Sequence, residues 1–481
     1  MHYTIYSTSI KKRFQQISRQ ISRGWDLTLE AIKGGDLDYT SMRIRKAITL
    51  LAIPMVFEMI MESIFAVADI FFVAKLGSEA VAAVGITESL MTIVYAVGFG
   101  LSMGTTAIVS RRIGEKNIEG ANTAAVQAIL GGLAASALLA IPGIFFAEDL
   151  LRLMGASESL ISDHSSYTKL MISMNAVIMF LFIINAIFRS AGNAAISMRV
   201  LFLANGINII LDPLLIFGLG PIPAMGVKGA AIATITGRGI AVLYQFYLLF
   251  GGYSKIKITL ASLKPEFMVL INLFRLSAGG IGQNLIATAS WVVMVRLVSG
   301  FGSEAVAGYT IAIRIIIFSL LPAWGISNAA ATLVGQNLGA KQPKRAETSA
   351  WITGIINMFL MGGISLVLII IPESLISIFT TNAAVIEYGV NGLRIISYGF
   401  VFYGLGMVMT QALNGAGDTF TPTLLNFIAF WMIEIPLAYS LSLYSDLASN
   451  GVFTAIVLAE SVLAILGMWV FWRGKWKTVK V

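Results

Sequence analysis

The sequence predicts an all-α membrane protein with twelve transmembrane helices in two pseudo-symmetric six-helix lobes. Three observations predict this fold: an apolar composition, long apolar segments joined by short loops, and a repeat that spans half the chain. Of 481 residues, 57% are hydrophobic and 12% are charged, and the mean hydropathy is +0.83. Soluble domains carry about 25% charged residues. Lipid must therefore solvate much of this protein's surface.

The composition also argues against several classes of function. There is no Cys, which excludes disulfides and thiolate chemistry, and the two His residues, His2 and His164, disfavour a His-based metal site or triad. We therefore predict a protein that is not an enzyme and that uses no cofactor beyond a coupling ion. The net charge of +8 is spread over short loops between apolar spans, so no nucleic-acid partner is expected.

Twelve segments are long enough to cross a membrane, which takes about 20 apolar residues. Several are longer, which indicates tilt or kinks, and Pro54 is expected to kink the first of them. The predicted spans are 48–73, 82–110, 122–146, 166–190, 196–219, 229–251, 267–298, 305–335, 348–372, 386–412, 420–443 and 451–472.

The first 46 residues are polar and basic. Ile10, Phe14, Ile17, Ile21 and Trp25 recur there at helical spacing between Lys and Arg residues. This pattern favours a basic amphipathic helix that lies on an anionic membrane surface. The alternative is a solvated tail.

Basic residues concentrate in the N-terminal segment, the even-to-odd loops and the C-terminal tail. Because cytoplasmic loops are enriched in Lys and Arg, both termini are expected in the cytoplasm of a multi-pass cell-membrane protein. The predicted divisions are a cytoplasmic segment 1–46, a first lobe 47–255, a second lobe 256–472 and a tail 473–481.

Three motifs repeat at one constant offset of 225 residues. The stretch GSEAVA at 77–82 recurs at 302–307, IGEK at 113–116 aligns with LGAK at 338–341, and AGN at 191–193 aligns with AGD at 416–418. Each repeat contains six spans, an even number, so the halves share one orientation and an axis along the membrane normal should relate them. Such halves typically enclose a central cavity and rock about it.

Acids inside apolar spans mark candidate sites, because a charge in hydrocarbon is costly and usually functional. Glu58, Glu62 and Asp69 fall on one stripe of the first span. Glu58, near the cytoplasmic end, also fits a solvated or structural role. The equivalent positions of the second half carry no acid and are Gln283, Ala287 and Met294. The ion chemistry is therefore expected in the first half.

A second polar group lies in spans five and six. Asn208 and Asp212 are one helical turn apart beside Pro213, and Thr234 lies in the next span. Their oxygens are hard ligands that suit Na⁺, or a proton shared between carboxylates. The alternatives are a helix-end role for Asp212 beside a kink, neutralisation of Asp69 by Lys75, a structural hydrogen bond for Glu62, and back-bonding of Thr234 to its own turn.

Other polar and soft residues in the spans suggest secondary roles. Glu434 and Glu460 form either a second polar patch or packing contacts, and Arg238 is expected to pair toward the cytoplasmic side. Met and aromatic side chains make adaptable walls for apolar cations. The candidates for a substrate cavity are Met55, Met59, Phe65, Met174 and Met179.

Longer motifs connect the chain to a known family. They are Pro54 and Asp69 followed by LGSEAVAAVG at 76–85, then RSAGN at 189–193 leading into NIILDP at 208–213, and GVKGAAIAT at 226–234. Together with the doubled halves, they resemble the multidrug and toxic compound extrusion (MATE) family over about residues 40–472. The resemblance implies a V-shaped pair of lobes that exports amphipathic organic cations in exchange for inward Na⁺ or H⁺.

Within the family, the chain is most similar to the branch related to DNA-damage-inducible protein F. The resemblance implies a coupling site at Asp69, Asn208, Asp212 and Thr234, where Na⁺ is a candidate ligand. Spans seven and ten lack the acids typical of norfloxacin exporters. Glu62 stands where relatives often have a neutral amide, and it is a candidate third carboxylate.

Three other functions are alternatives to drug export. A flippase for lipids or lipid-linked saccharides of the same superfamily would need a cationic cavity, and few basic residues lie mid-span. A membrane enzyme would need a nucleophile or metal cluster, and a channel a ring of equivalent pore residues. The expected partners are small organic cations and membrane lipids, and the expected state is a monomer.

Overall fold

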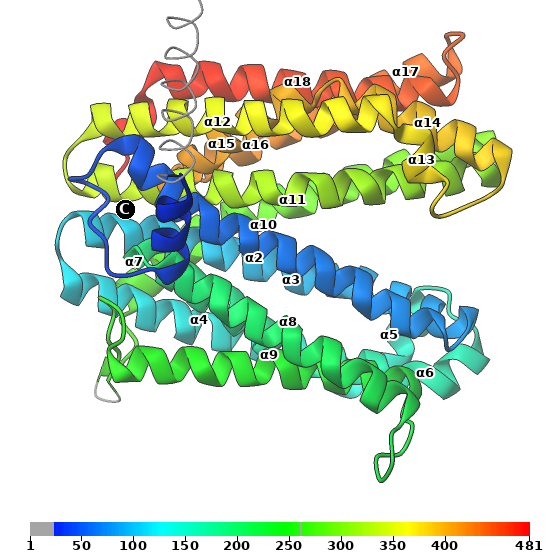
Figure 1. Cartoon of the computed structure of the whole chain (residues 1–481), viewed down its shortest axis with the longest axis horizontal. Helices are drawn as coiled ribbons and strands as arrows, with labels where there is room; N and C mark the ends of the chain where they lie inside the picture. The colour runs from blue at the N-terminus through cyan, green and yellow to red at the C-terminus, as the bar shows by residue number, and fades with distance from the viewer. Residues whose placement is uncertain (1–23, 260–261) are drawn as a thin grey trace, which may run out of the picture.

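The computed structural model describes residues 24–259 and 262–481, and nearly all of its regular structure is helical (Figure 1). The first half contains α2 (Ile44–Ala74), α3 (Ser78–Gly114), α4 (Ile118–Phe145), α5 (Ala147–Leu153), α6 (Glu158–Ser173), α7 (Ala176–Ala191), α8 (Ala194–Phe217) and α9 (Gly226–Gly251). The second half contains α10 (Phe267–Val298), α11 (Ser303–Gly339), α12 (Pro343–Ile370), α13 (Pro372–Ile376), α14 (Ala383–Ser397), α15 (Phe400–Ala416), α16 (Phe420–Asn426), the π-helix Phe427–Glu434, α17 (Ile435–Leu443) and α18 (Ser449–Arg473). A short helix at 24–33 precedes them.

The membrane spans follow the predicted pattern. Within the described residues, eleven helices are long and apolar enough to cross a membrane, and the bent pair α14 and α15 makes a twelfth. The fourth span breaks between α6 and α7, at Met174 and Asn175, and the tenth breaks at Tyr398 and Gly399 with a bend of 56°. These breaks lie about one repeat apart, so the two halves share this irregularity.

The first span is one continuous helix, and the expected kink at Pro54 stays a prediction. α2 continues through Pro54 as one helix of 31 residues. A proline inside a helix removes one backbone hydrogen bond. Here the surrounding helices keep the span continuous, because Pro54 and the neighbouring Met55 are buried against them.

The helices form two layers that converge at one end and diverge at the other (Figure 1). We call α2–α9 the N-lobe and α10–α18 the C-lobe. Each lobe has its own hydrophobic core, although Leu273 and Leu276 of α10 belong to the N-lobe core and the first half of α2 packs on α11. The first helix of each half therefore lies between the lobes, and the predicted boundaries at 47, 255 and 472 stay a prediction.

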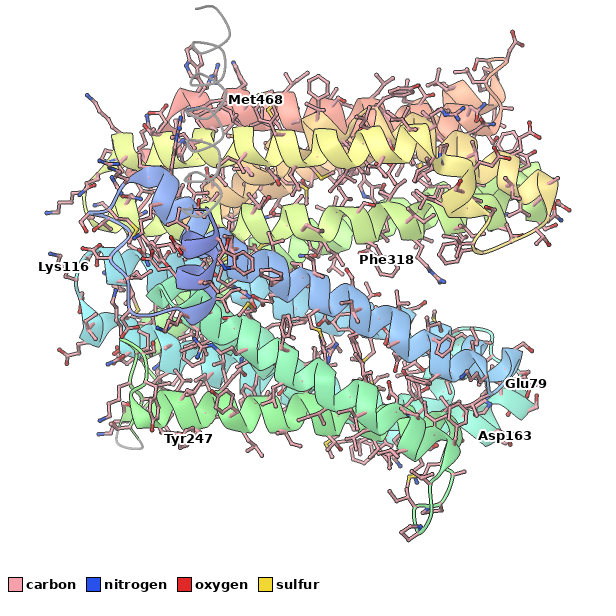
Figure 2. All side chains as sticks on the ribbon, viewed as in Figure 1. Glu79, Lys116, Asp163, Tyr247, Phe318 and Met468 are labelled. Carbon is pink, nitrogen blue, oxygen red and sulfur yellow. The ribbon has the colours of Figure 1, made fainter. Side chains whose placement is uncertain are left out.

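The lobes touch most closely at the converging end, which we call the closed end. Figure 2 shows Lys116 there, with Glu79 and Asp163 at the opposite end. A Cβ on Gly114 of α3 would overlap the carbonyl oxygen of Gln336, and one on Gly339 of α11 would overlap that of Arg111. Gly114 and Gly339 are equivalent in the repeat. Glycine is required at both positions because two backbones meet there.

The predicted amphipathic helix around Ile10, Phe14, Ile17 and Ile21 lies outside the described residues. Trp25, the last residue of that pattern, is 65% exposed on the helix at 24–33. Residues 24–43 are not a solvated tail, because Ala31 and Tyr39 are each 2% exposed.

Candidate functional site

The predicted polar group of spans five and six comes together inside the N-lobe. The Asn208 side-chain amide donates to Thr234 Oγ1 at 3.0 Å and lies 3.4 Å from Asp212 Oδ1. All three side chains are buried, and Asp212 is fully enclosed. The structure therefore joins α8 and α9 through the residues that the sequence singled out, and Thr234 faces Asn208 rather than bonding only to its own turn.

Two oxygens of this group have no hydrogen-bond partner. Asn208 Oδ1 and Asp212 Oδ2 are buried and unpaired among the described residues. A buried oxygen without a partner costs free energy comparable to a lost hydrogen bond, and a buried unpaired carboxylate costs more. A cation would satisfy both oxygens, and a proton would neutralise the carboxylate. The donor set therefore fits Na⁺ or H⁺.

Asp69 lies on the neighbouring helix α2, near the end where the lobes diverge. It is partly exposed, and α2 packs against α8, the helix that carries Asp212. Among the described residues, no basic group lies within 4.0 Å of its carboxylate. The Lys75 ammonium instead lies 4.4 Å from the centre of the Phe71 ring. Neutralisation of Asp69 by Lys75 is therefore not what the structure shows.

Glu62 has a different environment from the Asp69–Asp212 group. Its carboxylate forms an ion pair with Arg238 at 3.0 Å and accepts a hydrogen bond from Asn205 at 3.1 Å. The Arg238 side chain is 4% exposed, and its guanidinium lies 5.0 Å from the centre of the Phe65 ring. Arg238 thus pairs inside the N-lobe, midway along α9, as expected for a residue that needs a partner, and the membrane side toward which it pairs stays a prediction.

Glu58 belongs to a buried hydrogen-bond network of the N-lobe. Its Oε1 accepts from Arg189 at 2.6 Å and from Asn185 at 3.4 Å, and Gln245 donates to Asn185 at 2.8 Å. The Glu58 side chain is 2% exposed. This network ties α2 to α7 and α9 and supports the structural reading of Glu58.

Sequence reasoning missed one acid of the N-lobe. Glu88 lies in the second span and interacts electrostatically with Asp69, Glu62 and Arg238. Tyr95 lies one to two turns further along α3 and donates to Glu88 Oε2 at 3.4 Å. The rule that led to Asp69, an acid within an apolar span, applies equally to Glu88.

A cavity lies between the lobes, midway along the spans. Its walls combine aromatic rings of both lobes with amides of the C-lobe, because Phe99, Phe182 and Trp324 line it together with Asn284, Asn328, Gln411 and Asn414. Phe99 and Phe182 stack with ring centres 4.7 Å apart, and Trp324 meets Phe99 edge-on at 6.0 Å. Glu58, Glu62 and Arg189 also reach this wall.

Of the five predicted cavity residues, Met59 is the one that lines this cavity. Met55 is 1% exposed, at the close crossing of α2 and α11, and Met179 is fully buried in the N-lobe core. Met174 lies at the break of the fourth span, and Phe65 lies under Arg238. Met55 and Met179 are corrections, because helical packing rather than residue type decides which side chains reach the cavity, and Met174 and Phe65 stay predictions.

The C-lobe carries a smaller polar group. Ser290 donates to Glu434 Oε2 at 3.1 Å, and Glu434, at the end of the π-helix, is 2% exposed. Glu460 lies near enough to interact with it electrostatically. This arrangement agrees with the predicted second polar patch and also with a packing role.

The protein has two helical lobes in the membrane, a cavity between them and a buried polar site in one lobe. These features together define the class of membrane transporters. A family model described as MatE matches residues 54–214 and 281–440. The chain therefore belongs to the MATE family of transporters.

Relatives and solved structures agree with this assignment. The chain is 27% identical to a probable multidrug resistance protein NorM of Thermotoga maritima, over 90% of this chain and 93% of that protein. It is 27% identical to an FAD transporter of Shewanella oneidensis over 83% and 88% of the two chains. A solved multidrug resistance MATE transporter in an outward-facing conformation superimposes with a TM-score of 0.86 and 26% identity, over 91% of this chain and 98% of that one.

Proposed function

We propose that this transporter is an antiporter that exports amphipathic organic cations in exchange for inward Na⁺ or H⁺. The observation that carries the proposal is the pair of buried oxygens on Asn208 and Asp212 that have no partner among the described residues, with Asp69 on the adjacent helix α2. An ion or proton at this site removes the repulsion between the two carboxylates. Because these groups sit on α2 and α8, their charge state changes how the two helices pack.

The proposed orientation places the closed end and both termini in the cytoplasm. Arg111, Arg112, Lys116, Lys341 and Lys344 cluster at or near this end, as expected for a cytoplasmic surface. The structure is then an outward-open form in which Asp69 faces the exterior. Binding of the ion from outside, followed by release inside, provides the cycle of alternating access.

For Na⁺ coupling, Asp69, Asp212, Asn208 and Thr234 would hold the ion through their oxygens. For H⁺ coupling, Asp212 is the first acceptor, because its Oδ2 is enclosed and unpaired. Glu62 is a weaker candidate for direct coupling, since Arg238 and Asn205 already occupy its carboxylate. Its role would be to position Arg238 beside the site.

The cavity supports an aromatic, amphipathic substrate. Ring faces of Phe99, Phe182 and Trp324 attract flat cations, and Met59 adds an adaptable surface. The acids of this wall are neutralised by arginines, so Glu88 and Asp69 are the groups that attract positive charge within the N-lobe. We propose that transport needs one copy of the chain, since both lobes that form the cavity belong to it.

The alternative function, a flippase for lipids or lipid-linked saccharides, has less support. A pyrophosphate group would need free cations in the cavity, but Arg189 pairs with Glu58 at 2.6 Å, and Arg238 pairs with Glu62. Among the described residues that line the cavity, Arg189 is the one basic side chain. Export of organic cations therefore remains the better proposal.

The test is dye efflux from proteoliposomes under an imposed Na⁺ or pH gradient. Asp69→Asn and Asp212→Asn are expected to abolish ion-driven efflux, because a neutral amide cannot exchange charge. The exposed Asp163→Asn is the matched control and should transport like the parent protein. Undiminished ion-driven efflux by both site variants would refute the coupling model, and the gradient that drives the parent protein identifies the ion.

A further inference from the structure

Residues 24–43, which we call the strap, cross the closed end from one lobe to the other. Figure 1 shows this segment in dark blue, over the end where the two layers of helices converge. Two of its side chains, Ala31 and Tyr39, belong to a buried hydrophobic cluster. The same cluster contains Ala194 of α8 and Ala329 and Leu333 of α11.

The strap binds the N-lobe through three specific hydrogen bonds. The Tyr39 hydroxyl donates to the carbonyl of Gly192 at 3.0 Å, and Arg199 donates to the carbonyl of Lys33 at 2.6 Å. Lys255, just after α9, donates to the carbonyl of Leu37 at 2.7 Å. Gly192 follows α7 with φ of 98°, and a Cβ there would press on Leu37 and Tyr39. The absence of a side chain at Gly192 therefore leaves the space that Leu37 and Tyr39 of the strap occupy.

The same short stretch also binds the C-lobe. The Arg345 guanidinium, in the first turn of α12, donates to the carbonyl of Tyr39 at 2.9 Å and contacts the carbonyl of Met42. Tyr39 therefore bonds to Gly192 of one lobe through its hydroxyl and to Arg345 of the other through its carbonyl. Both bonds form together only while the lobes are close at this end.

The internal repeat gives the strap a counterpart. The segment between the lobes precedes α10 as the strap precedes α2, and there Gln127 of α4 donates to the carbonyl of Lys264 at 2.8 Å. Lys264 is the repeat equivalent of Tyr39, and α4 is the equivalent of α12. Each half thus begins with a segment held by the third span of the opposite half. The linker joins the lobes covalently, and the strap does so by non-covalent contacts.

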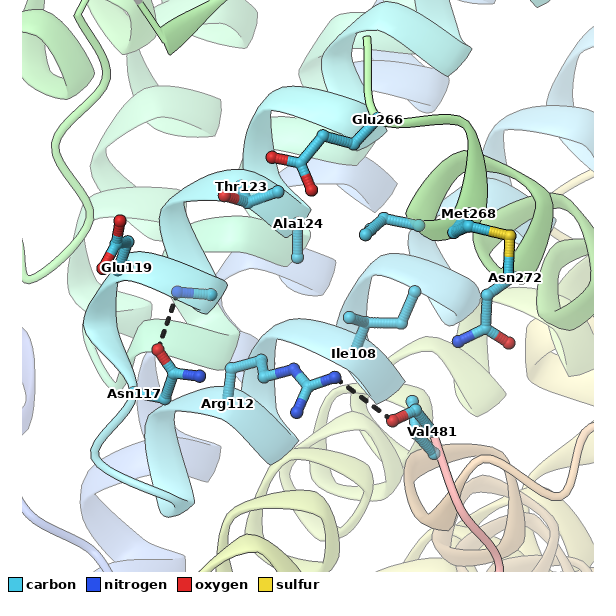
Figure 3. Close-up of a pocket in the computed structure, with 12 residues that line it drawn as sticks. Ile108, Arg112, Asn117, Glu119, Thr123, Ala124, Glu266, Met268, Asn272 and Val481 are labelled. Carbon is cyan, nitrogen blue, oxygen red and sulfur yellow. Dashed lines mark hydrogen bonds between the residues drawn. The ribbon is translucent and has the colours of Figure 1, made fainter. Parts of the chain in front are cut away.

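The C-terminal tail makes a third connection at this end. Lys477 pairs with Glu347 of α12 at 2.8 Å, while Arg111 of α3 donates to the carbonyls of Ala416 at 3.0 Å and Val479 at 3.2 Å. Figure 3 shows Arg112 reaching the carbonyl of Val481 at the edge of a surface hollow. Strap and tail thus cross between the lobes at the same end.

We propose that the strap is a latch that stabilises the form with the closed end shut, and that it must release from Arg345 or Gly192 before that end opens. A contact that forms in just one of two states shifts the equilibrium toward that state. The latch sets the balance between the two forms and hence the rate of cycling. This inference rests on the alternating access proposed above, but not on the coupling site.

The test measures the distance between the lobes at the closed end. The chain has no Cys, so spin labels can be placed at Glu119→Cys and Thr348→Cys, two exposed positions on α4 and α12, in the full chain in lipid nanodiscs. Pulsed electron spin resonance then gives the populations of short and long distances. Efflux is not part of the readout, so failure of the coupling model would leave this result unaffected.

Arg345→Gln is expected to raise the ratio of open to shut closed-end populations by about fivefold, the effect of losing one or two hydrogen bonds. Tyr39→Phe keeps the buried ring and removes only the hydroxyl, so it should raise the ratio by about twofold to threefold. Lys344→Gln, an exposed neighbour with the same charge change, is the control. Unchanged distances in both strap variants, or an equal shift in the control, would overturn the proposal.

Discussion

At the residue scale, four carboxylates of the N-lobe spans divide into two kinds. Glu58 and Glu62 each have an arginine partner, at 2.6 Å and 3.0 Å, whereas Asp69 and Asp212 have none within the described residues. A paired acid holds helices together, and an unpaired acid is available for an ion. The sequence predicted all four as intramembrane acids, but it could not separate the kinds, because the partners lie more than 120 residues away along the chain.

The pair of Glu58 and Arg189 gives a stability prediction. Glu58→Leu should destabilise the protein by about 3–5 kcal/mol, because it leaves a mostly buried guanidinium without its partner. Replacing both residues, as Glu58→Leu with Arg189→Met, should restore most of that loss. Thermal unfolding in detergent compares the single and double variants. A double variant less stable than the single one would show that the pair itself is not the source of the effect.

At the element scale, the crossing of α3 and α11 is where the lobes meet most closely at the closed end. Gly114 and Gly339 allow the two backbones to meet, and equivalent residues of the repeat make the contact from both sides. The shared motif around 113–116 and 338–341 indicated the repeat without showing why glycine recurs. Steric contact between helices that are distant in sequence supplies the reason.

Gly114→Ala is expected to separate α3 and α11 at the closed end and favour its open form, since the new methyl group overlaps the Gln336 carbonyl. Gly85→Ala on the same helix is the control, because nothing lies within 4 Å of a Cβ there. Distances between spin labels at 119 and 348 measure the change. Equal distance distributions in the two variants would contradict this account of the crossing.

At the scale of the whole molecule, ion binding and lobe movement must be linked. If the site at Asp69 and Asp212 binds its ion more tightly in one form, the ion must shift the population of forms by the same factor. Adding Na⁺ or lowering the pH should therefore change the distances between the labels at 119 and 348. Asp212→Asn should remove that response. A response of equal size in this variant would show that residues other than Asp212 link ion binding to lobe movement.

The amino-acid pattern alone was enough to predict the class of fold, the twelve spans, the repeat of 225 residues and the acids in the first lobe. These features depend on local composition and periodicity. An apolar segment in lipid must satisfy its own backbone hydrogen bonds, so it forms a helix wherever it occurs in the chain. Tertiary structure alone decided that Arg238 pairs with Glu62, that Met55 and Met179 are buried rather than on the cavity, and that residues 24–43 join the lobes. Each of these outcomes depends on contacts between spans that are distant in the chain, which no local pattern specifies.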